Sequence, residues 1–143
     1  MPKHTLFFCV RICVMTDLQL YQIAEKAAEG AYAPYSGYAV GAALLTIDGK
    51  VYTGANVENS SFGATICAER TAAVKAVTDG QRAFAALAVA APGTDGPAWP
   101  CGICRQFLFE FGGGIRIISG KDSASIEVYT LDELLPHGFR LSK

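Results

Sequence analysis

Three cysteines and one glutamate stand at spacings that suit metal-dependent chemistry. A single alanine separates Cys67 from Glu69, and Cys101 and Cys104 follow Pro100 as a C-x-x-C pair. Thiolates are good zinc ligands, and three protein ligands leave one position for water, whose pKa the metal lowers to about 7. A carboxylate that lies beside the metal without binding it can move the proton of that water. The pattern predicts one catalytic zinc ion per chain, with the three cysteines as ligands and Glu69 as the acid/base.

The expected helix starts explain how these side chains can converge. Residues i and i+2 do not share a face of a regular helix, so Cys67 and Glu69 can reach one point only if Cys67 lies where a loop meets a helix. The alanine-rich pattern that follows Cys67 predicts this junction. Cys101 and Cys104 are three residues apart and would share one face of a first helical turn. The partial positive charge of a helix N-terminus favours the thiolate form of such cysteines.

The order of these motifs is typical of zinc-dependent deaminases, in which a His or Cys, one residue and a Glu precede a distant Pro-Cys-x-x-Cys. The segments NVENSSFGATICAERTA and PCGICRQ resemble the homotetrameric cytidine deaminases, and the resemblance covers residues 16–139. It implies a three-layer α/β/α sandwich with a mixed five-stranded sheet. It also implies hydrolysis of cytidine and 2′-deoxycytidine to uridine and 2′-deoxyuridine plus ammonia, a step of pyrimidine salvage.

The same resemblance implies substrate-binding roles for residues outside the metal motif. Asn56 and Glu58 of the ANVEN segment would hydrogen-bond a ribose hydroxyl, and the Ala68 backbone would help to read the pyrimidine. Tyr38 stands where the family often has Phe, which would place a hydroxyl near the ribose pocket. The segment LLPHGF matches a family segment whose aromatic ring reaches the active site of a neighbouring subunit, and that ring would be Phe139.

Two arginines adjoin the ligand motifs. Arg70 follows Glu69, and Arg105 follows Cys104. Three thiolates and one Zn²⁺ leave a net negative charge, so we expect both arginines to offset it. By resemblance, Arg70 also corresponds to a family arginine that hydrogen-bonds the zinc thiolates.

Other uses of the cysteines are compatible with parts of the pattern. A C-x-x-C pair alone can be a redox pair, although the upstream Cys67–Glu69 motif disfavours that reading. A closed structural zinc with Cys9 or Cys13 as the fourth thiolate would leave the Glu69 spacing unexplained. Within the deaminases, the alternatives are a blasticidin-type deaminase and an editor of cytosine in RNA or DNA.

Composition limits the partners of this chain. Its 143 residues suit one domain. Hydrophobic residues make up 51% and charged residues 17%, so part of the apolar surface is expected between subunits, and the family resemblance implies that these form a homotetramer. Twelve basic and 13 acidic residues give a net charge of -1, which argues against a nucleic-acid partner and favours a small nucleoside substrate. The five cysteines do not follow a disulfide framework, which predicts a reducing compartment, the cytoplasm.

Hydrophobic periodicity predicts a layered α/β domain. The expected strands are residues 38–47, 50–57, 84–91, 115–119 and 126–130. The expected helices are residues 18–31, a segment that begins at Cys67, residues 102–111 and residues 131–135. The first two strands flank Asp48-Gly49, a strong hairpin signal. The run at 84–91 is apolar throughout, as expected of a central strand that is covered on both faces.

The N-terminal residues need a separate interpretation. Arg11 interrupts their apolar run, no small-residue cleavage site follows, and the run is too short to span a membrane. Thr16 and Gln19 have the spacing of a capping box, so helical structure is expected to begin there. We expect residues 1–14 to be a loosely attached extension or to lie upstream of the natural start. Residues 15–143 would form a single catalytic domain.

Overall fold

The computed structural model describes residues 14–143, which form four α-helices and a five-stranded sheet. The helices are α1 (Asp17–Ala27), α2 (Ala68–Thr78), α3 (Gly102–Phe109) and α4 (Leu131–Leu134). The strands are β1 (Gly41–Thr46), β2 (Val51–Ala55), β3 (Phe84–Ala90), β4 (Arg116–Gly120) and β5 (Ile126–Thr130). The predicted elements are therefore confirmed in type and order. The predicted extension, apart from Val14, lies outside the described residues. Within residues 14–143, no helix is both long enough and apolar enough to cross a membrane.

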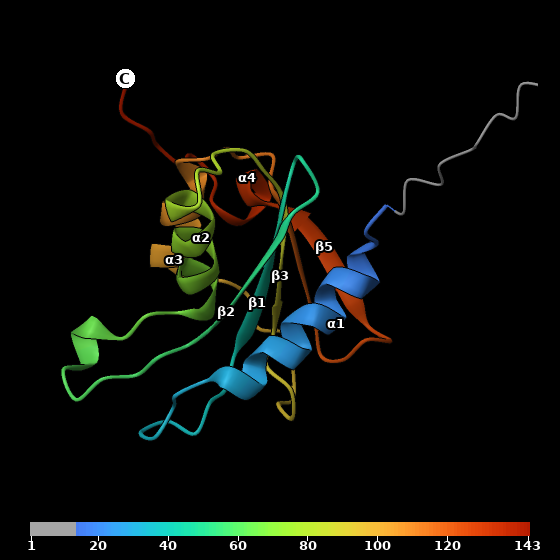
Figure 1. Cartoon of the computed structure of the whole chain (residues 1–143), viewed down its shortest axis with the longest axis vertical. Coiled ribbons are helices and arrows are strands. Elements are labelled where there is room, and N and C mark those ends of the chain that lie inside the picture. Colours follow the sequence, from blue (N-terminus) through green and yellow to red (C-terminus); the bar gives the residue numbers. More distant parts are fainter. Residues whose placement is uncertain (1–13) are drawn as a thin grey trace, which may run out of the picture.

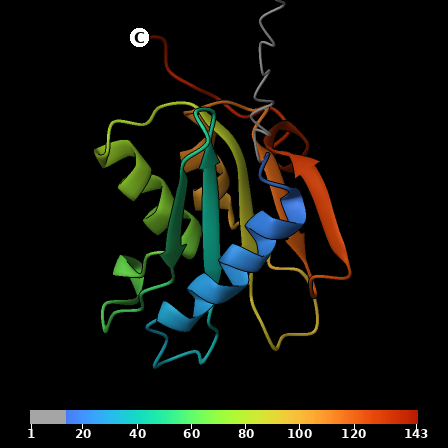
Figure 2. The same cartoon turned by 45° about the vertical axis from the view of Figure 1, so that its right-hand side comes forward.

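The sheet has the strand order β2-β1-β3-β4-β5. Its β3–β4 pair is parallel and its other pairs are antiparallel, so the predicted mixed sheet is confirmed. Helix α1 lies on one face of the sheet, and α2 and α3 lie on the other (Figures 1 and 2). This arrangement is the expected three-layer α/β/α sandwich.

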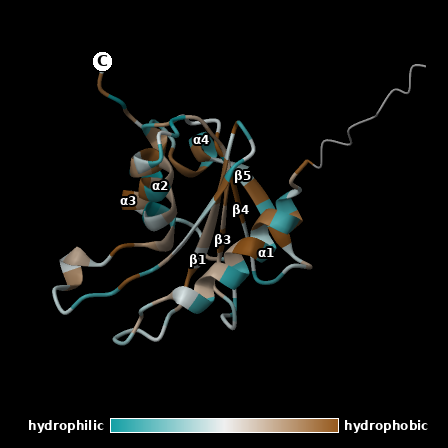
Figure 3. Cartoon of the chain, in the orientation of Figure 1, coloured by the Kyte–Doolittle hydropathy of each residue, from teal (hydrophilic) through white to brown (hydrophobic). Residues whose placement is uncertain are grey.

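Strand β3 is buried on both faces, which explains its continuous apolar run. Ala86, Ala88 and Ala90 pack in the apolar cluster beneath α1. Leu87 and Val89 point the other way and pack in the cluster beneath α2 and α3. Figure 3 shows brown, apolar residues along the strands between the helices, whereas α1 carries both brown and teal residues. Because alternate side chains of β3 point to opposite faces, this strand packs against helices on both sides of the sheet.

Helix α1 begins at the predicted capping box. The Thr16 backbone N–H donates to Gln19 Oε1 at 2.9 Å, and the Gln19 N–H donates to Thr16 Oγ1 at 3.1 Å. The α-helix ends at Ala27 rather than at residue 31. It continues as a 3₁₀ turn over Ala28–Gly30, a common way for the last turn of a helix to tighten.

Strands β1 and β2 are shorter than predicted, and a side chain supplies two hydrogen bonds next to the end of their ladder. Asn56 Oδ1 accepts a hydrogen bond from the Val40 N–H at 2.9 Å, and Asn56 Nδ2 donates to the Tyr38 carbonyl at 2.7 Å. The Val40 carbonyl also accepts a hydrogen bond from the Asn56 backbone N–H at 3.2 Å, and the Tyr38 N–H donates to Ser36 Oγ at 3.0 Å. These hydrogen bonds place Tyr38, Val40 and Asn56 together at the end of the hairpin.

Gly54 lets β2 approach the first turns of α2, the helix that carries Glu69. A Cβ at this position would lie 2.5 Å from the Ala72 nitrogen and 2.6 Å from the Ala68 oxygen, both backbone atoms. We therefore expect Gly54→Ala to push α2 away from the sheet and to lower the free energy of unfolding by about 1–3 kcal/mol. Thermal unfolding measures the effect. Gly63→Ala is the control, because a Cβ added at Gly63 would meet no atom within 4 Å; equal stability of the two variants would contradict this packing.

Candidate active site

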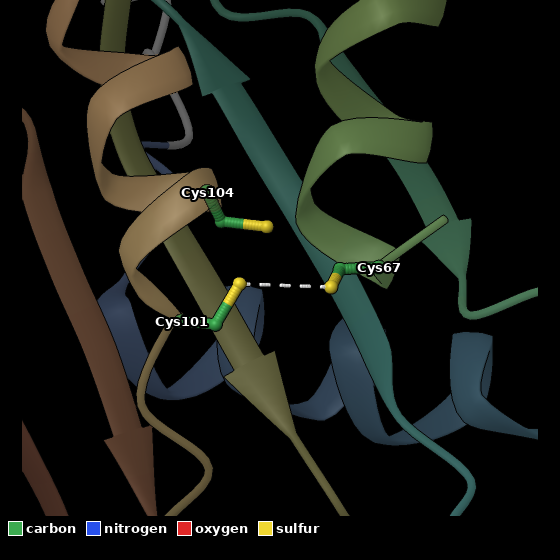
Figure 4. A group of neighbouring side chains, drawn as sticks. All are labelled: Cys67, Cys101 and Cys104. Carbon is green, nitrogen blue, oxygen red and sulfur yellow. Dashed lines mark hydrogen bonds between the residues drawn. The ribbon is translucent and has the colours of Figure 1, made fainter. Parts of the chain in front are cut away.

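Two helix N-termini bring the three cysteines together. Cys67 is the N-cap residue of α2, as predicted, and Cys101 is the N-cap residue of α3, one position before its first helical residue. Neither side chain makes a capping hydrogen bond, so both sulfurs remain available to a ligand. Cys104, in the first turn of α3, is fully buried. The three side chains converge in the space between the two helices (Figure 4).

The spacing of the three sulfurs fits a zinc ion. All three sulfurs lie within 4.8 Å of one another, and those of Cys67 and Cys101 are 3.8 Å apart. A tetrahedral site with Zn–S bonds of about 2.3 Å requires sulfurs roughly 3.8 Å apart. The cysteines are free thiols, and thiolates are preferred zinc ligands. The geometry of the cluster is therefore compatible with a zinc ion that has three protein ligands, the arrangement that the sequence spacing predicts.

The surroundings of Cys67 favour its thiolate form. Hydrogen bonding with Cys104, and next with the Arg70 guanidinium, lowers the pKa of the Cys67 thiol well below its ordinary value. Arg70 donates to Cys67 Sγ at 3.5 Å and to the Thr65 carbonyl at 3.4 Å. The Arg70 guanidinium thus lies close enough to the Cys67 sulfur to offset the negative charge of its thiolate, as expected.

Arg105, the second arginine beside the ligand motifs, makes its hydrogen bonds to backbone carbonyls. Its Nε donates to the Pro100 carbonyl at 2.7 Å, and its Nη1 donates to the Leu134 carbonyl at 2.6 Å. The guanidinium therefore links the start of α3 to the end of α4. The expectation that Arg105 offsets the charge of the thiolates stays a prediction, because these two hydrogen bonds fix the guanidinium without testing it.

Glu69 is buried beside the cysteine cluster. Only 4% of its surface is exposed, although it is a carboxylate in the first turn of a helix. Burial raises the pKa of Glu69 to about 7, because an apolar environment disfavours the charged form. A carboxyl group with this pKa can hold a proton or release one near neutral pH, which is the requirement for an acid/base catalyst.

A cavity of about 180 Å³ opens next to Glu69 and two of the cysteines. The lining residues are Tyr38, Val40, Asn56, Thr65, Cys67, Ala68, Glu69, Val89, Ala98, Trp99 and Cys101. A larger hollow of about 550 Å³ lies against Phe109 and the C-terminal residues, and none of the predicted site residues lines it. The smaller cavity is the candidate active site because it combines an apolar wall with the metal-binding and acid/base groups.

Asn56 and Glu58 occupy different places relative to this cavity. Asn56 is buried and lines it. Glu58 lies in an adjoining hollow that shares Thr65 with the cavity. Its carboxylate accepts hydrogen bonds from the Tyr35 N–H at 2.9 Å and from the Ser36 N–H at 3.1 Å and hydroxyl at 2.5 Å. The Ser36 hydroxyl in particular lowers the pKa of Glu58.

The remaining predicted residues divide between the cavity and the surface. Tyr38 and Ala68 line the cavity. Phe139 does not line it in its own chain: the Phe139 side chain is 65% exposed, and its carbonyl accepts a hydrogen bond from Gln106 Nε2 at 3.1 Å. A contact of Phe139 with this type of site would therefore need a second subunit.

Several lining residues were not predicted to belong to the site. They are Val40, Thr65, Val89, Ala98 and Trp99. From the sequence, Val89 could be recognised only as part of an expected strand, and Thr65 could be recognised only as a neighbour of the Cys67 motif. Trp99 had a stronger sequence signal for a site residue, because it is the single tryptophan of the chain and directly precedes Pro100-Cys101.

Comparisons with known proteins agree with this site. Residues 15–119 match the family described as the cytidine and deoxycytidylate deaminase zinc-binding region. The chain is 51% identical over 117 residues to a cytidine deaminase of Sporosarcina psychrophila, covering 81% of this chain and 85% of the relative. It is 48% identical over 126 residues to that of Halalkalibacterium halodurans, covering 87% and 95%. The crystal structure of cytidine deaminase from Burkholderia pseudomallei matches with a TM-score of 0.83 and 46% identity, over 87% of this chain and 100% of that one. The chain belongs to the cytidine and deoxycytidylate deaminase family.

Proposed function

We propose that this protein is a zinc-dependent enzyme that hydrolyses cytidine and 2′-deoxycytidine to uridine and 2′-deoxyuridine, with release of ammonia. The observation that carries the proposal is the buried Glu69 carboxyl next to three converging thiols, at the wall of a cavity. Free nucleosides of this kind are the substrates of pyrimidine salvage.

Glu69 performs the proton transfers in this proposal. Cys67, Cys101 and Cys104 would hold zinc, which would act as a Lewis acid and lower the pKa of water enough for attack near neutral pH. Glu69 accepts one proton of the attacking water and delivers it to N3 of the pyrimidine as the new C–O bond forms at C4. Glu69 then takes the remaining proton of the hydroxyl group on C4 and delivers it to the amine, so that the C4–N bond breaks, ammonia leaves and the C4 carbonyl forms. A pKa of about 7 suits both directions of transfer.

Asn56 and Glu58 are proposed to bind the sugar. Two backbone contacts use one N–H and one lone pair of the Asn56 amide, which leaves one donor and one acceptor. Glu58 accepts three hydrogen bonds, and an ionised carboxylate has about four acceptor sites. A sugar hydroxyl can take up the unused hydrogen-bonding groups of both side chains. Tyr38 and the Ala68 backbone line the cavity where the ribose and base would lie.

We also propose a homotetramer in which Phe139 reaches the site of a neighbouring subunit. Phe139 and Phe62 are 65% and 73% exposed, so both rings are available to a neighbouring subunit, which supports this proposal. Sedimentation velocity of the purified protein tests it. A stable monomer that deaminates cytidine at full rate would exclude the shared site.

A cytoplasmic location is proposed from the state of the cysteines. Cys67, Cys101 and Cys104 must stay reduced to act as ligands, and a reducing compartment keeps them so. Residues 15–143 are proposed to form the single catalytic domain, with residues 1–14 as an extension of it.

The proposed reaction is tested by following the absorbance of cytidine while zinc is quantified in the same sample. Conversion of the amino-pyrimidine to the oxo form, with about one zinc per chain, is the expected result. A panel of cytidine, 2′-deoxycytidine, cytosine, deoxycytidylate, blasticidin S and single-stranded DNA identifies the substrate. Zinc without turnover of any member would contradict the proposal and favour a structural metal site.

A further inference from the structure

Trp99 joins the active-site cavity to the core of the protein. It lines the cavity together with Ala98 and Cys101. Its two neighbours in the chain, Ala98 and Pro100, are buried, and the half-buried Trp99 packs against the apolar cluster beneath α2 and α3. The indole therefore has a defined place at the wall of the cavity, two residues before a metal-binding cysteine.

An aromatic residue of the edge strand supports this indole. The ring centroids of Trp99 and Tyr129 are 5.2 Å apart, and the ring planes meet at 75°. Such edge-to-face pairs contribute stability beyond that of the buried area. Tyr129 lies in β5, opposite Ile117 of β4, so the sheet fixes its backbone. Tyr129 thus braces the indole from a strand that does not itself line the cavity.

The cavity is lined both by reactive groups and by apolar side chains. Glu69, Cys67 and Cys101 are the reactive groups, and Val89, Ala98 and Trp99 are among the apolar residues. In a cavity of about 180 Å³, a pyrimidine whose C4 lies at the reactive groups would place part of its ring against apolar side chains. Aromatic side chains bind bases through their flat faces with little dependence on base identity.

We infer that Trp99 is a substrate-binding residue that packs against the pyrimidine, and that Tyr129 is the positioning residue that holds the indole there. This inference rests on the proposed nucleoside substrate. It assigns affinity for the base to Trp99 and leaves the proton transfers to Glu69.

Variants of the two residues separate binding from chemistry. In the zinc-loaded enzyme, Trp99→Ala should raise KM for cytidine by about tenfold, the effect of losing one base–aromatic contact, with a smaller change in kcat. Tyr129→Leu should raise KM in the same direction but less. Tyr129→Phe keeps the aromatic edge and should retain the KM of the unmodified enzyme. Zinc content and thermal unfolding are measured for each variant. An unchanged KM in Trp99→Ala, or equal effects of Tyr129→Leu and Tyr129→Phe, would overturn the inference.

Fluorescence gives a readout that does not require turnover. Trp99 is the single tryptophan of the chain, so tryptophan emission reports on this wall alone. Titration with uridine, the proposed product, should change the emission of the unmodified enzyme, and Tyr129→Leu should shift half-saturation to higher uridine. An enzyme that deaminates cytidine but shows no emission change would overturn the role of Trp99 and leave the proposed function intact. Failure of the unmodified enzyme to deaminate cytidine would instead contradict the proposed function.

Discussion

Replacement of Glu69 by glutamine is expected to abolish nearly all deamination while the protein keeps its fold and its zinc. Glutamine has almost the shape of the protonated carboxyl group, so it can occupy the same buried place. It cannot accept the proton of water or return one to the pyrimidine. General acid–base catalysis contributes about 10²–10⁴-fold to a rate, and a loss of kcat of at least this order is expected. Steady-state kinetics and zinc analysis on the same preparation measure the two effects.

Glu58→Gln is the matched control, because it makes the same chemical change in the adjoining hollow. If Glu58 binds the sugar, this variant should mainly raise KM, since an amide accepts fewer hydrogen bonds than a carboxylate. Loss of zinc in Glu69→Gln would mean that Glu69 is a ligand. A fully active Glu69→Gln enzyme would remove it from the mechanism altogether.

Each half of the cysteine cluster could be predicted from the sequence because its geometry is local, and the order of the deaminase motifs indicated that the two halves meet. Cys67 and Glu69 can converge only at a helix start, and Cys101 and Cys104 stack within one helical turn, so spacing alone restricts where they lie. The burial of β3 on both faces could be predicted in the same way, since a strand that is covered on both faces has a continuous apolar run.

Contacts between distant segments could not be predicted in this way. The Asn56 amide hydrogen-bonds the backbone at Tyr38 and Val40, just before β1, and no local rule indicates these contacts. Arg105 directly follows Cys104, but its guanidinium donates a hydrogen bond to the carbonyl of Leu134, 29 residues away. The place of Trp99 depends on Tyr129 of β5, a strand whose position is set only by the assembled sheet.

Loss of one buried thiol should empty the metal site. Cys104 is fully buried, and Cys104→Ser would leave two thiols and a hydroxyl, which is a weaker donor set for zinc. We expect zinc to fall from about one per chain to near zero, and deamination to disappear with it. Because a metal that binds only the folded state stabilises it, by about 2.7 kcal/mol at a hundred times its Kd, the variant should also unfold at a lower temperature.

A comparison within the same chain separates metal loss from general damage. Chelation of zinc from the unmodified protein should lower its unfolding temperature to nearly that of Cys104→Ser, since both then lack the metal. The double variant Cys9→Ser, Cys13→Ser should keep its zinc, activity and stability, because three ligands suffice for a catalytic site. Loss of zinc from that double variant would show a fourth thiolate and favour a closed structural site. Retention of zinc by Cys104→Ser would show that Cys104 is not a necessary ligand, and it would contradict the proposed site of three cysteines.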